Sequence, residues 1–143
     1  WRQHMKERYV FMKYRFVLHD VARFPIVIFR SELAQGGFAA AWMREMDALL
    51  EGGQPFVIIS DAPSRTEDHE DFRARGVWLK ANKDKLAIYC KALIHIEPDA
   101  ERREALSAMV VGFARAFGVA QLVAGDEATA EHLATSVLSA VIP

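Results

Sequence analysis

The sequence lacks three features that would assign it to a broad class of protein. Its 143 residues include one cysteine, Cys90, so no disulfide can form within the chain, and a reducing compartment is favoured. No apolar run approaches the roughly 18 residues of a membrane-spanning helix. The 18 basic and 19 acidic residues nearly balance, whereas binding to nucleic acid or an anionic membrane requires excess positive charge. We therefore expect a cytoplasmic protein whose partners include neither nucleic acid nor a membrane.

The enzyme motifs that can be identified by spacing are also missing. The chain has no glycine-rich dinucleotide or phosphate loop, no Gly-x-Ser-x-Gly elbow and no Cys-x-x-Cys pair. The run from Glu67 to Asp71 holds one histidine among carboxylates, but Arg73 stands where a His-Glu-x-x-His zinc site needs its second histidine. An exposed helix face matched to the helix dipole explains these carboxylates better than a metal site. The sequence thus predicts no cofactor, no metal and no catalytic residue.

The clearest structural signal lies between Gln54 and Glu97. A short apolar run, Phe56 to Ile59, is followed by a polar turn, a charged helical segment and a second apolar run from Leu86 to Ile96. Two apolar strands joined through a helix form a βαβ unit, in which the strands are parallel. In the connection, Ser64 and Glu67 have the spacing of a capping box, which predicts that the helix begins there.

The segments on either side continue this alternation. A half-exposed edge strand, Tyr14 to His19, leads into an apolar strand from Pro25 to Phe29, and the short connection favours an antiparallel pair. A last strand is expected from Val119 to Ala124. Helical periodicity predicts four helices, whose main buried positions are Trp42, Met46 and Leu49; Phe72, Gly76 and Leu79; Leu106, Val110 and Phe113; and Ala130, Ala134 and Val137.

The predicted fold class is therefore α/β, in the order β-β-α-β-α-β-α-β-α. Such an alternation implies a mostly parallel sheet with an antiparallel first strand. We assign residues 14–143 to one domain. Residues 1–13 are interpreted as an N-terminal extension or as a segment added upstream of it.

This order of elements resembles the SpoIIAA/STAS-like fold of anti-sigma-factor antagonists, a single-domain fold. Local similarity is carried by Ile26 to Arg30, Val57-Ile-Ile-Ser-Asp61, Trp78-Leu-Lys-Ala-Asn82, Tyr89-Cys-Lys-Ala-Leu93 and Glu127-Ala-Thr-Ala130. The resemblance covers nearly all of residues 14–138. It implies a bacterial, cytoplasmic protein that acts in signalling by binding another protein.

The resemblance also points to the loop after the strand that ends near Ser60. In the antagonists this loop carries an Asp-Ser-Ser/Thr-Gly segment whose serine is phosphorylated, whereas this chain reads Ser60-Asp-Ala-Pro-Ser64-Arg-Thr66. Because open α/β sheets bind ligands at the carboxyl ends of their strands, the candidates for binding or phosphorylation are Ser60, Asp61, Ser64 and Arg65. A turn followed by a helix cap explains the same residues, and we prefer the cap for Ser64.

The apolar run from Leu86 to Ile96 contains an unusual polar pair. Lys91 and His95 are four residues apart, so they are expected on one face of a buried strand. Each then needs a partner or a path to solvent. Cys90 is expected to pack as a small apolar group on the face opposite to His95.

Two functional hypotheses follow. The first is a non-enzymatic protein-interaction or regulatory module of the SpoIIAA/STAS-like type, with another protein as partner. The second is a small-molecule-binding protein, or an enzyme of unrecognised type, that uses the strand-end loop around Asp61 and Ser64. An edge strand also presents unpaired backbone groups, so we expect a homodimer formed through the N-terminal segment or the first strand.

Overall fold

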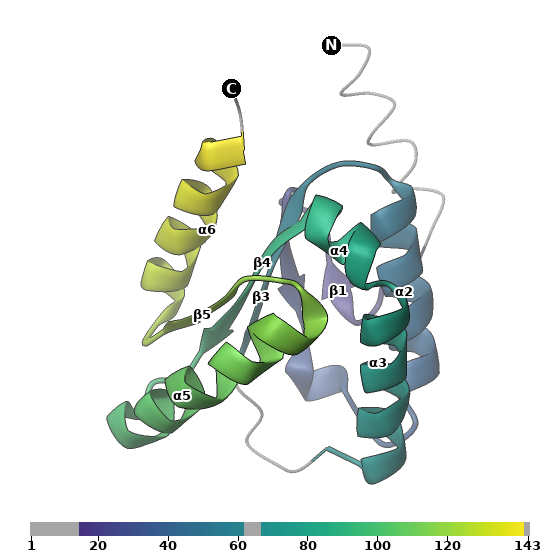
Figure 1. The fold of residues 1–143 in the computed structure, drawn as a ribbon, viewed down its shortest axis with the longest axis horizontal. Coiled ribbons are helices and arrows are strands. Elements are labelled where there is room, and N and C mark those ends of the chain that lie inside the picture. The colour runs from purple at the N-terminus through teal and green to yellow at the C-terminus, as the bar shows by residue number, and fades with distance from the viewer. Residues whose placement is uncertain (1–14, 62–66, 142–143) are drawn as a thin grey trace.

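The computed structural model describes residues 15–61 and 67–141 (Figure 1). Its strands are β1 (His19–Asp20), β2 (Ile26–Phe29), β3 (Phe56–Asp61), β4 (Cys90–Ile96) and β5 (Gln121–Ala124). Its helices are α2 (Ala39–Glu51), α3 (His69–Ala81), α4 (Lys83–Tyr89), α5 (Ala100–Phe117) and α6 (Glu127–Val141), with a short 3-10 turn, η1 (Ser31–Leu33).

The five strands form one sheet in the order β1-β2-β3-β4-β5. Strand β1 is antiparallel to β2, and every other neighbouring pair is parallel. In the central register, Ile58 of β3 lies between Val27 of β2 and Leu93 of β4. The predicted α/β class, the antiparallel first strand and the parallel pairing of β3 with β4 are thus confirmed.

The helices cover the two faces of the sheet unequally. Crossovers between parallel strands are right-handed, so strands that follow one another in a single direction place their connecting helices on one face. That face carries a core to which α2 and α3 contribute Trp42, Met46 and Trp78. Helix α6 packs on the other face, where Ala130 and Ala134 contact a second core, and Figure 1 shows the sheet between α6 and α2.

The first strand is shorter than predicted. The backbone amides of Val17, Leu18 and His19 all donate to the Glu45 carboxylate, at 2.9, 3.1 and 2.9 Å. The chain therefore bends around α2 and pairs with β2 only at His19 and Asp20. Glu45 itself is buried and only 7% exposed. Three of the amides expected to lie free at this sheet edge are therefore already bonded.

The start of α3 also differs from the prediction. The helix begins at His69, and the Asp68 side chain caps it by accepting a hydrogen bond from the Glu70 amide at 3.2 Å. The capping-box prediction is therefore wrong for the helix start. Its physical reason is that Glu67 forms an ion pair with Arg75 instead of reaching back to an amide. Ser64 lies outside the described residues.

Helix α3 buries only part of the predicted stripe: Leu79 packs against the core that contains Trp78. Phe72 and Val77 are 59% and 64% exposed, whereas Trp78 and Asp71 are buried. The Trp78 ring packs edge-on against Trp42 with 5.2 Å between ring centroids. Asp71 was predicted to lie on the exposed face, and it is buried because it accepts hydrogen bonds from backbone amides at the start of α2.

The apolar run that was predicted as one strand is divided between two elements. Residues up to Tyr89 belong to α4, and β4 begins at Cys90. A register shift opposite Phe56 leaves Lys91 as an extra residue in β4. As a result Cys90 and Leu93 pack in the same core, and the strict alternation that separated Cys90 from His95 is lost.

Candidate functional site

The carboxyl end of β3 brings two of the predicted site residues into the sheet. Ser60 is half-buried and pairs in register with His95, while Asp61 is exposed and pairs with Ile96. The other two candidates, Ser64 and Arg65, lie outside the described residues. The described part of the strand end therefore offers one exposed carboxylate and one half-buried hydroxyl.

Behind this strand end lies a largely buried ion pair that the sequence interpretation missed. Arg75 of α3 pairs with Glu67, and their side chains are 26% and 21% exposed. The guanidinium carbon lies 4.7 Å from the Trp42 ring centroid and 5.4 Å from that of Phe38, within cation–π range. Burial lowers the pKa of the Arg75 guanidinium, and the Glu67 carboxylate opposes that shift. The arginine remains charged.

The pair leaves two polar atoms unused. Glu67 Oε2 and Arg75 Nε are buried and have no hydrogen-bond partner among residues 15–61 and 67–141. Native structures leave few such groups unpaired. One acceptor and one donor are therefore available beside the strand end.

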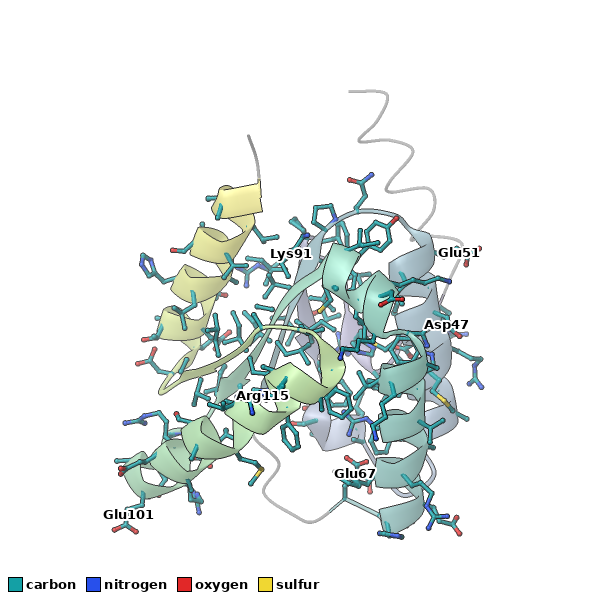
Figure 2. All side chains as sticks on the ribbon, viewed as in Figure 1. Asp47, Glu51, Glu67, Lys91, Glu101 and Arg115 are labelled. Carbon is teal, nitrogen blue, oxygen red and sulfur yellow. The ribbon has the colours of Figure 1, made fainter. Side chains whose placement is uncertain are left out.

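His95 completes the polar side of this region. Its Nε2 lies 2.7 Å from Oε1 of Gln121 at the start of β5. Burial lowers the pKa of His95, and the nearby Arg75 charge lowers it further, so the ring is neutral near pH 7 and donates from Nε2 to the glutamine oxygen. Lys91, labelled in Figure 2, is the half-buried extra residue near the start of β4, and His95 lies near the other end of that strand.

A second buried polar cluster lies beneath the first strand. His19 Nδ1 is 2.9 Å from Oε1 of Glu45, which also accepts the three amides described above. Burial acts to raise the pKa of Glu45, but the hydrogen bonds from His19 and the amides outweigh it, so this pKa lies below its ordinary value. A groove of about 510 Å³ lies beside this cluster and is lined by Arg15, Arg44 and Glu45 among others.

Cys90 packs as a small apolar group, as the sequence suggested. It is buried, and burial raises the pKa of its thiol to about 12. A thiol with that pKa stays protonated at neutral pH and is a poor nucleophile.

The missed residues share a pattern that was present in the sequence. Asp71, Arg75 and Trp78 are spaced i, i+4, i+7 and so share one helix face. This is the face that α3 turns toward α2. A search for apolar stripes does not detect this face, because two of its three residues are charged. The stripe at Phe72, Gly76 and Leu79 is more apolar, and apolar periodicity therefore favours it.

Comparisons with other proteins add no assignment. No family model, curated protein or solved structure matches the chain. Among residues 15–61 and 67–141, no group of three or more His, Cys, Asp or Glu side chains is arranged to hold a metal ion. No helix in that part of the chain is long and apolar enough to cross a membrane. The site is therefore interpreted from its own chemistry.

Proposed function

We propose that the protein is a non-enzymatic regulatory module of the SpoIIAA/STAS-like type that binds another protein in a bacterial cytoplasm. The partner contacts the carboxyl edge of the sheet, where β3 ends and α3 begins. The observed order of elements agrees with the family resemblance, and the chemistry of the described residues supports a binding role.

The observation that carries this proposal is the exposure of Phe72. A phenylalanine that is 59% exposed lies in the first turns of α3, with the exposed polar residues His69, Glu70 and Arg73 around it. Protein interfaces are typically built from an aromatic anchor inside a polar rim. Helix α3 is itself fixed to α2 through Asp71 and Trp78, so Phe72 is presented on a preorganised helix.

The state of the reactive side chains supports binding over catalysis. The Cys90 thiol is protonated and buried. His95 is neutral and bonded to Gln121, and His19 is bonded to Glu45 in the interior. Each of these groups is engaged in a structural contact.

The proposal is tested by site-specific photo-crosslinking in cells of the source organism. A photoreactive phenylalanine analogue at position 72 is expected to capture one partner reproducibly. The matched control is position 77 on the same helix, where Val77 is equally exposed but lies on another face. With the purified partner, Phe72→Ala should weaken binding by at least about tenfold, and Val77→Ala should not. Equal capture at both positions, or unchanged affinity of Phe72→Ala, would refute the proposal.

A second function is favoured by the unused atoms of the Glu67–Arg75 pair. A small-molecule-binding protein, or an enzyme working at the strand-end loop around Asp61 and Ser64, would offer Glu67 Oε2 and Arg75 Nε to a polar ligand. A panel of small carboxylates and amides should then raise the thermal midpoint of the wild type but not of Glu67→Gln. If no compound distinguishes the two proteins, this second function is wrong.

A further inference from the structure

The backbone groups at the two edges of the sheet differ in their hydrogen bonding. At the β1 edge, Glu45 bonds the amides of Val17 and Leu18. At the β5 edge, the carbonyls of Ala120 and Ala124 accept from the amides of Leu93 in β4 and Glu97 just after it, at 2.9 Å each. By the alternation of a strand, the backbone groups of Gln121 and Val123 point away from β4.

The β5 edge has little protection beyond its short length of four residues. No hydrogen bond joins the outward groups of Gln121 and Val123 to another residue in the ranges that the structure describes. The strand reads Gln-Leu-Val-Ala, without the charged residue, proline or bulge that normally prevents pairing with another chain. The β5 edge can therefore pair with one more strand.

Helix α5 lies beside this edge and adds a side-chain surface to it. A groove of about 370 Å³ separates the helix from β5, and Ser107, Val111 and Leu122 are among its lining residues. Val111 is 58% exposed. An exposed stripe at helical spacing runs along this side of α5 and consists of Glu104, Ser107, Ala108, Val111 and Arg115.

The stripe carries opposite charges at its two ends. Glu104 is near the first turn of α5 and Arg115 is in its last turn, and neither forms an ion pair with another described residue. Figure 2 shows the end of the helix that bears Glu101 far from Arg115. A stripe that is acidic at one end, neutral in the middle and basic at the other is complementary to its own copy after a two-fold rotation.

We propose that the α5–β5 edge is a homodimer interface. Strand β5 pairs antiparallel with β5 of a second copy, so that Gln121 and Val123 exchange backbone hydrogen bonds and one sheet continues across both subunits. The two α5 helices pack antiparallel on one face of that sheet, with Glu104 of each copy opposite Arg115 of the other. The neutral strand places no like charges opposite each other. This interface is separate from Phe72 on α3 and does not depend on the proposed function.

A charge-swap series on the full chain tests the helix contact. Glu104→Arg and Arg115→Glu each place like charges together twice per dimer, and each should raise the dimer dissociation constant at least about tenfold in sedimentation equilibrium. The double variant E104R/R115E restores the attraction and should dimerise within about threefold of the wild type. Lys80→Glu changes an exposed base in the last turn of α3 and should have no effect. Circular dichroism confirms that each variant is folded.

Hydrogen exchange tests the strand contact without any substitution. The amides of Gln121 and Val123 should become protected as the protein concentration rises, and should lose that protection in Arg115→Glu. A wild type that is monomeric at the highest soluble concentration overturns the proposal. So do single variants that dimerise like the wild type, or a dimer in which both amides exchange freely.

Discussion

Two buried carboxylates, Asp71 and Glu45, hold backbone segments that are distant in the sequence. Asp71 of α3 accepts from the amides of Gly37 and Ala39 at 2.8 and 3.1 Å. It therefore caps α2, whose own N-cap residue, Phe38, has no side chain able to do so. Glu45 of α2 holds the segment before β1 in the same way. Each carboxylate satisfies amides that would otherwise be buried without partners.

Replacing Asp71 by Ala should destabilise the protein by roughly 1–3 kcal/mol, the cost of leaving buried amides without an acceptor. The neighbouring Glu70→Ala is the control, because Glu70 is exposed and its loss should change the free energy of unfolding by less than about 0.5 kcal/mol. Urea unfolding measures both. Equal effects of the two substitutions would show that Asp71 is not the cap of α2.

The lowered pKa of Glu45 predicts a specific dependence of stability on pH. Because the folded state holds this carboxyl below its ordinary value of 4.5, its contribution is complete above that value. The contribution is lost as the pH falls through the lower folded pKa. Near neutral pH, Glu45→Gln should be less stable than the wild type by more than about 1 kcal/mol.

The measurement is urea unfolding of both proteins over a range of pH. The difference in their unfolding free energies should shrink steadily once the pH falls well below 4.5. A difference that stays constant over that range would mean that the charge of Glu45 does not bond the β1 segment.

The burial of Asp71 and Glu45 could not be predicted from apolar stripes, for a physical reason. A polar side chain is reliably exposed only when no other group of the folded protein forms a hydrogen bond or ion pair with it. The partners of Asp71 and Glu45 are backbone amides more than 25 residues away, and local patterns do not contain them. Arg75 was missed in the same way, because its partners include two aromatic rings from outside α3.

At the scale of elements, local chemistry explains two of the helix ends. Gly118 ends α5 with a φ of 70°, a left-handed conformation that glycine adopts without a Cβ penalty. Asp126 caps α6 by accepting from the Thr129 amide at 2.7 Å. The division of the apolar run at Tyr89 was not predictable, because a short apolar run is equally consistent with a buried helix and a buried strand.

Two glycines should respond to alanine in opposite directions. Gly118→Ala forces a left-handed backbone on a residue with a Cβ, and that Cβ would lie 3.1 Å from the Lys83 side chain. Gly118→Ala should therefore lower the free energy of unfolding by about 1 kcal/mol. Gly76 lies inside α3, and a Cβ added there would meet open space. Gly76→Ala should therefore stabilise the protein by up to about 1 kcal/mol. Thermal unfolding of both variants gives the signs, and two changes in the same direction would contradict this account.

At the scale of the whole molecule, the sequence predicted the topology well and the interior less well. Because crossovers between parallel strands are right-handed, an alternation of strands and helices is compatible with few sheet topologies. The observed sheet has one of these topologies. The faces that the helices bury depend on side chains from several elements. The stripes of α2 and α6 were predictable, as Met46 and Ala134 show, because apolar side chains dominate them. The face of α3 that buries charged side chains was not predictable.

The last prediction concerns the face of the sheet that α6 covers. Ala130 and Ala134 are fully buried against β3 and β4, so α6 packs closely on the strands through small side chains. Ala134→Leu should force the helix away and cost about 1–3 kcal/mol, the usual penalty for overfilling a packed core.

The matched control for this change is Ser136→Leu, which adds a similar side chain two residues away at an exposed position of α6. It should alter the unfolding free energy by less than about 0.5 kcal/mol. Urea unfolding separates the two variants. If Ala134→Leu is as stable as the control, α6 does not pack closely against the sheet, and the second core is a weaker part of the fold than its burial indicates.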